Sequence, residues 1–317
     1  MNETNSHLLR GSLCTMLGGV CWGFSGTCGQ YLFSRFGVSS LWLTCLRLLS
    51  GGIIMLLLAT IHHRRDLRNI WHSPSDAGML IGYGIFGLMM CQYAYMTSIS
   101  YSNAGTTTVL QTLSLVIIML LTCLRLRRRP NRLETIALLL ALLGTFLLAT
   151  GGDPAHMVLS PQGLFWGLAT AVAVTVYTLL PRQLLSRWGR EVVNGWGMLI
   201  GGAVLNLAAR SWTFQINLPI RGWLAVGAIV LFGTVLSFTL FMQGIQDIGP
   251  VKSSMLAATE PVSATIFSAV WLGTAFSTVD LVGFAAIIAT IFLLSVPQKH
   301  TCGHASDSHA TDPSEAQ

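Results

Sequence analysis

One carboxylate, Glu260, lies near the middle of a largely apolar stretch, residues 250–272, and is followed directly by Pro261. A charged side chain at the centre of a bilayer costs roughly 2.5 to 3.5 kcal/mol on insertion scales, and such groups usually face a cavity. A carboxyl group there can exchange a proton during transport, and Pro261 removes a helical hydrogen bond and lets the helix bend. A protonated glutamate that only hydrogen-bonds a neighbouring helix is the alternative, and the sequence leaves both interpretations open.

Arg47 lies inside another apolar stretch, residues 39–61. Its guanidinium can pair with a carboxylate or a substrate anion, or its long side chain can reach the membrane interface. The aligned position in the second half of the chain is Gly197, so we do not expect a symmetric role in the two halves. Glu260, Pro261 and Arg47 are the candidates for coupling or gating.

Hydrogen-bonding side chains in other apolar stretches are candidates for the lining of a cavity that holds a zwitterion. They are Ser25, Gln92, Tyr95, Thr107, Gln111, Tyr177 and Gln243. Two tryptophans, Trp22 and Trp166, could form apolar walls or contact a cation. For both, the neighbouring glycines make close helix packing the alternative.

Cysteine and histidine patterns predict neither a disulfide framework nor a metal site. Six of the seven cysteines fall inside apolar stretches, as packing residues would. Metal donors near the C-terminus are one cysteine with scattered histidines, a poor zinc pattern: His300, Cys302, His304 and His309. We predict no cofactor, and the phosphate-binding pattern G-x-x-x-x-G-K-[ST] is absent from the sequence, so uphill transport would need an ion gradient.

The chain that positions these residues is too apolar for a soluble domain. Of its 317 residues, 52% are hydrophobic and 9% charged, with a mean hydropathy of +0.63, whereas soluble domains carry roughly a quarter charged residues. A bilayer core about 30 Å thick needs about 20 apolar residues per helix, so ten spans need about 200 residues. The net charge of +6 requires no nucleic-acid partner, and nucleic-acid binding is excluded as the main role.

Gaps between charged residues predict an all-α integral membrane protein with ten transmembrane helices. The spans are 11–34, 39–61, the two parts of 77–124 on either side of a polar turn at 100–103, 135–150, 163–180, 193–209, 222–245, 250–272 and 281–296. With a cytoplasmic N-terminus, 14 of the 18 Lys and Arg residues lie in cytoplasmic connections and tails, and three, Arg35, Arg210 and Arg221, lie outside. The positive-inside rule therefore predicts that both termini are cytoplasmic.

An internal repeat divides the chain into two five-helix halves. A shift of 146 residues superposes Gly87, Met96, Ile99 and Leu110 on Gly233, Met242, Ile245 and Leu256. Because five is odd, the halves are expected to be inverted around a central cavity, an architecture of many secondary transporters. The predicted segments are a cytoplasmic tail at 1–10, a first repeat at 11–150, an external linker at 151–162, a second repeat at 163–296 and a disordered cytoplasmic tail at 297–317.

Several motifs resemble those of the drug/metabolite transporter superfamily, in particular bacterial proteins with two EamA domains. They are Trp22-Gly23 and Trp166-Gly167, Arg47, the stretch from Ser102 to Leu110, and the stretch from Ala257 to Val262. The first half departs from the pattern, because it has Ser114-Leu115 where the family often has an apolar or acidic residue followed by proline. The resemblance implies a basket of helices around a cavity in the bacterial inner membrane. It also implies a transporter of small metabolites, commonly an exporter of amino acids or related compounds.

Other functions remain as alternatives. Within the transporter class these are multidrug efflux and metabolite import. A membrane enzyme is disfavoured because the sequence has neither H-E-x-x-H nor paired intramembrane aspartates, and a non-transporting membrane partner is disfavoured because no sizeable soluble domain follows the last span. Membrane lipids are expected partners. The basic run from Arg125 to Arg132 could bind anionic lipid, but its role in setting the topology already explains it. The substrate, the coupling ion and formation of a homodimer stay open.

Overall fold

The structure, a computed structural model, describes residues 3–62, 64–153 and 157–295. No strand occurs among these residues. The helices of the first half are α1 (Glu3–Phe36), α2 (Ser40–His62), α3 (Asp66–Asn69), η1 (Ile70–His72), α4 (Pro74–Gly82), η2 (Tyr83–Met89), α5 (Met90–Tyr101), α6 (Ala104–Gln111), α7 (Ser114–Arg125) and α8 (Arg132–Thr150). Those of the second half are α9 (Pro161–Leu179), α10 (Arg182–Trp188), α11 (Arg190–Ala209), η3 (Ser211–Thr213), α12 (Ile220–Val230), η4 (Leu231–Leu236), α13 (Ser237–Ile248), α14 (Pro250–Leu256), α15 (Thr259–Leu272) and α16 (Thr278–Ser295). The predicted C-terminal tail, with His300, Cys302, His304 and His309, lies outside the described residues.

Seven helices in the described part of the chain are long and apolar enough to cross a membrane. They are Ser40–Ile61, Pro74–Tyr101, Ala104–Arg125, Arg132–Thr150, Pro161–Leu179, Arg190–Ala209 and Ile220–Ile248. The other predicted spans fall on α1, whose apolar residues are diluted by glycine, serine and threonine, on α14–α15, which is interrupted, and on α16, which is shorter. The count of ten spans therefore stays a prediction.

The helix boundaries of the two halves repeat at nearly the same shift of 146 residues. This shift places α4–α5 on α12–α13, α6–α7 on α14–α15, and α8 on α16, with ends that agree to within about one residue. Two π-helical segments, η2 and η4, also correspond, and they contain the paired glycines Gly87 and Gly233. The breaks between α6 and α7 and between α14 and α15 correspond as well. The agreement of these irregular features supports the internal repeat.

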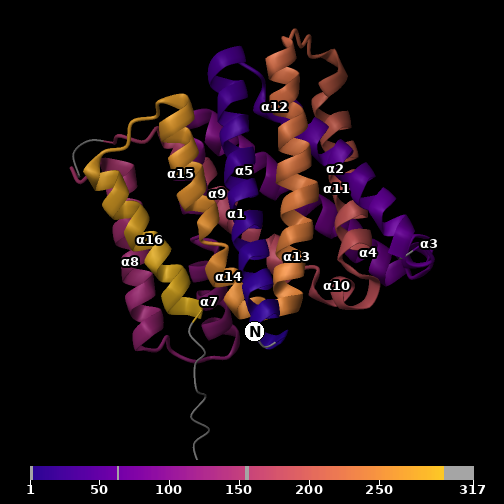
Figure 1. Ribbon diagram of the computed structural model, residues 1–317, viewed down its shortest axis with the longest axis horizontal. Helices are drawn as coiled ribbons and strands as arrows, with labels where there is room; N and C mark the ends of the chain where they lie inside the picture. The colour runs from indigo at the N-terminus through magenta and orange to yellow at the C-terminus, as the bar shows by residue number, and fades with distance from the viewer. Residues whose placement is uncertain (1–2, 63, 154–156, 296–317) are drawn as a thin grey trace, which may run out of the picture.

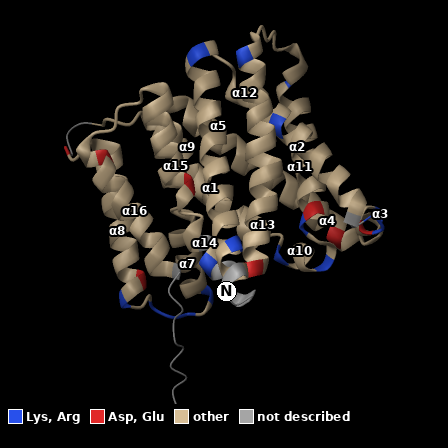
Figure 2. Cartoon of the chain, viewed as in Figure 1, with Lys and Arg blue, Asp and Glu red and all other residues tan. Residues whose placement is uncertain are grey.

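The long helices lie side by side in a bundle with α1 near its centre (Figure 1). Helix α1 packs against α12, α13 and α15, whereas α8 and α16 pack on each other at one side and α2 packs on α11 at the other. Lys and Arg gather at the end of the bundle where the N-terminus lies, in α3, α10 and the α7–α8 connection (Figure 2). Few basic residues lie at the opposite end. The two ends of the bundle thus differ in charge as the positive-inside rule requires.

Two glycines of α1 let α15 approach closely at the position of Glu260. A Cβ added at Gly23 would lie 2.7 Å from the backbone oxygen of Glu260 and 2.7 Å from the backbone nitrogen of Ala264. One turn earlier, a Cβ at Gly19 would lie 3.2 Å from the backbone nitrogen of Glu260. The small-residue spacing predicted for close helix packing therefore fixes where α15 presents its carboxylate.

Replacing Gly23 by alanine is expected to destabilise the protein by about 1 to 3 kcal/mol, because the added methyl group meets backbone atoms that cannot rotate away. The apparent melting temperature of the purified protein in detergent measures this effect. Gly227→Ala is the matched control, since a Cβ at Gly227 of α12 meets nothing within 4 Å and alanine favours the helix over glycine. Equal melting temperatures for Gly23→Ala and the wild type would contradict the packing argument.

Candidate functional site

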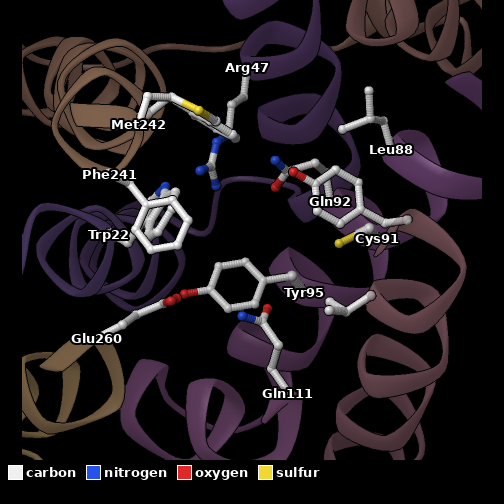
Figure 3. A pocket seen from close by; sticks show the side chains of 13 residues that line it. Trp22, Arg47, Leu88, Cys91, Gln92, Tyr95, Gln111, Phe241, Met242 and Glu260 are labelled. Carbon is white, nitrogen blue, oxygen red and sulfur yellow. The ribbon is translucent and has the colours of Figure 1, made fainter. Parts of the chain in front are cut away.

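A cavity of about 250 Å³ lies inside the bundle, between helices from both halves. Its walls come from α1, α2, η2, α5, α6, α9, α13 and α15. The lining residues are Trp22, Arg47, Leu88, Cys91, Gln92, Tyr95, Gln111, Val174, Tyr177, Phe238, Phe241, Met242 and Glu260. Figure 3 shows the labelled side chains pointing into this space. Apolar and aromatic walls with a few convergent polar groups are typical of small-molecule sites.

Arg47 is the basic residue of the cavity, and only 6% of it is exposed. Its Nη2 donates to the backbone oxygen of Gly233 over 3.2 Å, but Nε and Nη1 find no hydrogen-bond partner among the described residues. Gly233 lies in the π-helical segment η4, and a Cβ there would overlap Ser25 and approach Nη2 to 3.1 Å. A glycine is therefore required for Arg47 to reach this carbonyl. Two donor nitrogens of the guanidinium are therefore left for a ligand.

Glu260 faces the same cavity from the first turn of α15. In Figure 3 its carboxyl group lies near the hydroxyl of Tyr95 and the amide of Gln111, while the guanidinium of Arg47 lies on another wall. The N-terminus of a helix favours negative charge, because its first backbone N–H groups point toward the end of the helix. The cavity thus carries an acidic side and a basic side.

Pro261 explains why α15 begins beside the cavity. Proline has no N–H, so the carbonyl of Ala257 cannot receive the usual helical bond from position 261. That carbonyl instead accepts from the backbone nitrogen of Glu260 over 2.9 Å, a tighter turn that separates α14 from α15. The sequence predicts a bend at Pro261 within one helix; the structure has two helices instead, and the break lies on the N-terminal side of the proline.

Aromatic rings form one apolar side of the cavity. Trp22 packs edge-on against Phe238, with ring centroids 5.4 Å apart, and in a tilted arrangement against Phe241, with ring centroids 5.2 Å apart. Tyr177 stacks on Tyr83 at 5.9 Å. The hydroxyl of Tyr83 in turn donates to the side-chain oxygen of Asn194. These contacts hold the wall residues in fixed orientations.

The structure brings together seven of the predicted site residues and places the others elsewhere. Those that line the cavity are Trp22, Arg47, Gln92, Tyr95, Gln111, Tyr177 and Glu260. Thr107 is buried next to Ser98, with 2.9 Å between their hydroxyl oxygens, and Trp166 packs on Tyr93 outside the cavity wall. Ser25 lies behind Arg47 against Gly233. Pro261 is buried beside Glu260.

Sequence reasoning missed the apolar part of the lining. These residues are Leu88, Cys91, Val174, Phe238, Phe241 and Met242. Nothing in their type separates a cavity wall from a lipid-facing surface. The one available signal was helical spacing, since Phe238, Phe241 and Met242 follow one another at intervals that share a helix face.

A second cavity, of about 470 Å³, lies between the first and the basic end of the bundle. It shares Phe238 and Met242 with the first cavity, and it contains Gln243, which the sequence predicted as a cavity residue. The start of α11 contributes Arg190, Glu191 and Asn194. Two wall residues in common make the two cavities direct neighbours.

Toward the opposite end of the bundle, the side chain of Gln30 is 9% exposed and hydrogen-bonds three other segments. Its oxygen accepts from the backbone nitrogen of Ala104 and from Ser268 Oγ, each over 2.9 Å, and its nitrogen donates to Thr274 Oγ1 over 2.8 Å. One amide thereby joins α1, α6, α15 and the α15–α16 connection. Stacking of Tyr31 on Trp271, with centroids 5.1 Å apart, lies on the same side.

Comparisons with known proteins agree with a membrane transporter. The model of the EamA-like transporter family matches residues 9–150 and again residues 161–296. The chain is 36% identical over 292 residues to the uncharacterized inner membrane transporter YicL of Salmonella typhimurium, covering 92% of this chain and 96% of YicL. It is 22% identical over 284 residues to the uncharacterized inner membrane transporter YedA of Escherichia coli K12, covering 87% of this chain and 88% of YedA. A solved crystal structure that is 20% identical superposes with a TM-score of 0.61 over 91% of this chain and 96% of that one, which shows the fold alone.

Proposed function

The chain belongs to the EamA-like transporter family, and on this premise we propose that it exports amino acids or related small metabolites across the bacterial inner membrane. The observation that carries the proposal is the cavity with Arg47 and Glu260 on its walls. In this proposal the second cavity is a vestibule toward the basic end, and the hydrogen bonds of Gln30 keep the other end closed. Such an arrangement suits the cytoplasm-facing state of an alternating-access cycle.

The architecture in this proposal has ten spans in two inverted halves. The repeated helix boundaries support it, and so does the course of α8 and α16. Helix α8 starts at the basic end, whereas α16 ends there, so the two repeat partners run in opposite directions (Figures 1 and 2). Two nearly equivalent inverted halves can exchange conformations and expose a central site to each side in turn.

Proton coupling is the energy source in this proposal. Glu260 is the acidic residue of the cavity, and a carboxyl group that is protonated on one side of the membrane and deprotonated on the other can drive uphill movement. The sequence has no phosphate-binding loop that would couple ATP hydrolysis to transport.

The experiment that tests export is mass-spectrometric profiling of the growth medium. Cells that express the wild type are compared with cells that express Glu260→Ala at matched membrane levels. A metabolite that is enriched outside only with the wild type identifies the substrate class and fixes the direction. Depletion of a metabolite from the medium by the wild type alone, with no metabolite enriched there, would overturn export in favour of import.

Multidrug efflux is the second candidate, because the aromatic wall of Trp22, Phe238 and Phe241 is a surface on which a lipophilic cation can stack. Resistance of growing cells to several unrelated lipophilic cations, lost in Glu260→Ala, would favour efflux of drugs. Medium profiles that differ in amphiphilic metabolites without any such resistance would favour the metabolite exporter.

Both termini are expected in the cytoplasm, since basic residues concentrate at the end of the bundle that holds the N-terminus (Figure 2). Alkaline phosphatase fused after Gln317 should therefore be inactive, because that enzyme needs an oxidising compartment. The same fusion placed in the 151–162 connection should be active and serves as the positive control. An active C-terminal fusion would show that the topology is reversed.

A further inference from the structure

We propose that the cavity holds a small zwitterion by its two charged ends, with the carboxylate on Arg47 and the ammonium group on the side of Glu260. This assignment rests on the proposed function and names the substrate chemistry of the same cavity. It predicts that the cavity selects ligands that carry both a carboxylate and an ammonium group, and that the side chain of the ligand matters less.

The unused donors of Arg47 define one side of the cavity. The residue is 6% exposed, and Nε and Nη1 have no partner among the described residues. Buried donors left unpaired are costly, and those of a charged group more so. A planar guanidinium presents its N–H groups in the geometry of a carboxylate, and such charge-assisted bonds are short and strong. A carboxylate is therefore the ligand that fits this end.

The acidic end combines a carboxylate with neutral acceptors and aromatic faces. Glu260, the hydroxyl of Tyr95 and the amide of Gln111 lie on one side of the cavity (Figure 3). An ammonium group has three donors and no acceptor, so the carboxylate oxygens of Glu260 and the hydroxyl oxygen of Tyr95 match it. Trp22 and Phe241 line the same cavity, and aromatic faces attract a cation.

Charge balance favours a ligand that carries both groups. Arg47 and Glu260 have opposite charges, so a zwitterion pairs with both and adds no net charge to the cavity. A ligand with an anionic group alone leaves the carboxylate of Glu260 unpaired, and one with a cationic group alone leaves Arg47 unpaired. Burying a charge without its partner is the costly case. A cavity volume of about 250 Å³ suits a ligand of the size of a single amino acid.

The test measures binding by isothermal titration calorimetry to the full-length protein in nanodiscs. The probes are L-leucine and L-phenylalanine, their amides, which lack the carboxylate, and their N-acetyl derivatives, which lack the ammonium group. The wild type should bind at least one free amino acid ten or more times more tightly than its amide and its N-acetyl derivative. In Arg47→Gln the preference over the amide should disappear, while the preference over the N-acetyl derivative persists. Glu260→Gln should show the reverse pattern.

Two further variants keep the test independent of folding. Arg47→Lys preserves the charge and should retain part of the preference over the amide. Arg221→Gln removes an exposed arginine at the far end of α12 and should bind as the wild type does. The assignment is wrong if the wild type binds neither amino acid, if it binds the amides as tightly as the acids, or if Arg47→Gln keeps the wild-type preference.

Failure of the assignment and failure of the proposed function give different results. Export of a compound that lacks a carboxylate would overturn the zwitterion site and leave the exporter intact. Binding with the expected charge pattern, but with no amino-acid-like compound released into the medium, would overturn export and leave the site intact.

Discussion

Replacing Glu260 by glutamine is expected to abolish proton-driven accumulation of substrate, with a loss of tenfold or more. Glutamine keeps the size and the hydrogen-bonding capacity of the side chain but cannot bind and release a proton between pH 5 and 9. Among the described residues that line the cavity, Glu260 is the acidic one, so no other carboxylate of this lining can replace it. Proteoliposomes with an imposed pH gradient measure the effect as the ratio of accumulated to free substrate.

Exchange of labelled against unlabelled substrate, without a pH gradient and at saturating concentration, separates coupling from binding. The glutamine variant should keep measurable exchange, and its rate should no longer vary with pH. Glu260→Asp preserves the carboxyl group and should recover a pH-dependent rate. Accumulation by Glu260→Gln with the pH profile of the wild type would show that the proton is carried elsewhere.

The two charged cavity residues could be predicted from the sequence because the membrane makes their placement expensive. Arg47 and Glu260 are charges inside apolar stretches, and such charges usually face a cavity or pair inside the bundle. The same logic is weaker for neutral polar groups, since a hydroxyl can be satisfied within its own neighbourhood. Thr107 bonds Ser98 and does not reach the cavity, whereas Gln111, one turn later on α6, does.

Apolar lining residues could not be predicted, because an apolar side chain has about the same free energy facing the lipid as facing a cavity. Phe238 and Met242 would be equally stable facing lipid, and only the rotation of α13 turns them toward the cavities. That rotation depends on packing against α1, where glycines such as Gly18 allow backbone contact with Ser237 and Phe241. Helix rotation is a property of the assembled bundle, so a single apolar stretch does not reveal it.

One helix break was predictable and its counterpart was not. Pro261 indicates an interrupted helix before α15, because it has no backbone N–H to donate to the carbonyl of Ala257. The break between α6 and α7 has no proline. There Thr112 bonds the carbonyl of Val109 through both its backbone nitrogen and its hydroxyl, a local alternative to the helical ladder that threonine offers in many contexts. Only the repeat, which aligns the two breaks, makes this one recognisable.

Gln30 shows a further limit of sequence reasoning. It lies in the first predicted span at the same spacing as Trp22 and Gly26, and Gly26 faces the hydroxyl of Tyr95, since a Cβ there would lie 2.5 Å from that oxygen. This stripe of α1 therefore runs from the cavity to the closed end. The role of Gln30 depends on hydrogen bonds to three partners that are distant in the sequence. The spacing of residues in one helix cannot predict these partners.

Replacing Gln30 by leucine is expected to open the closed end of the bundle. The variant loses the hydrogen bonds to Ala104, Ser268 and Thr274 and leaves the fully buried hydroxyl of Ser268 without its partner in α1. At about 0.5 to 1.5 kcal/mol for each bond, the closed state loses roughly 1.5 to 4.5 kcal/mol relative to the open state, a population shift of about tenfold or more.

Pulsed electron paramagnetic resonance measures this shift between spin labels at Ser34→Cys and Ala275→Cys in a background without native cysteines. Both positions are exposed at the closed end, and a longer distance should gain population in Gln30→Leu. Thr274→Val removes one of the three bonds and should give a smaller gain, while Arg221→Gln should give none. Identical distance distributions in Gln30→Leu and the wild type would mean that the apolar contacts around Trp271 hold this end closed without the amide. In that case the barrier to opening resides in the aromatic stack, and Trp271→Ala should produce the opening that Gln30→Leu did not.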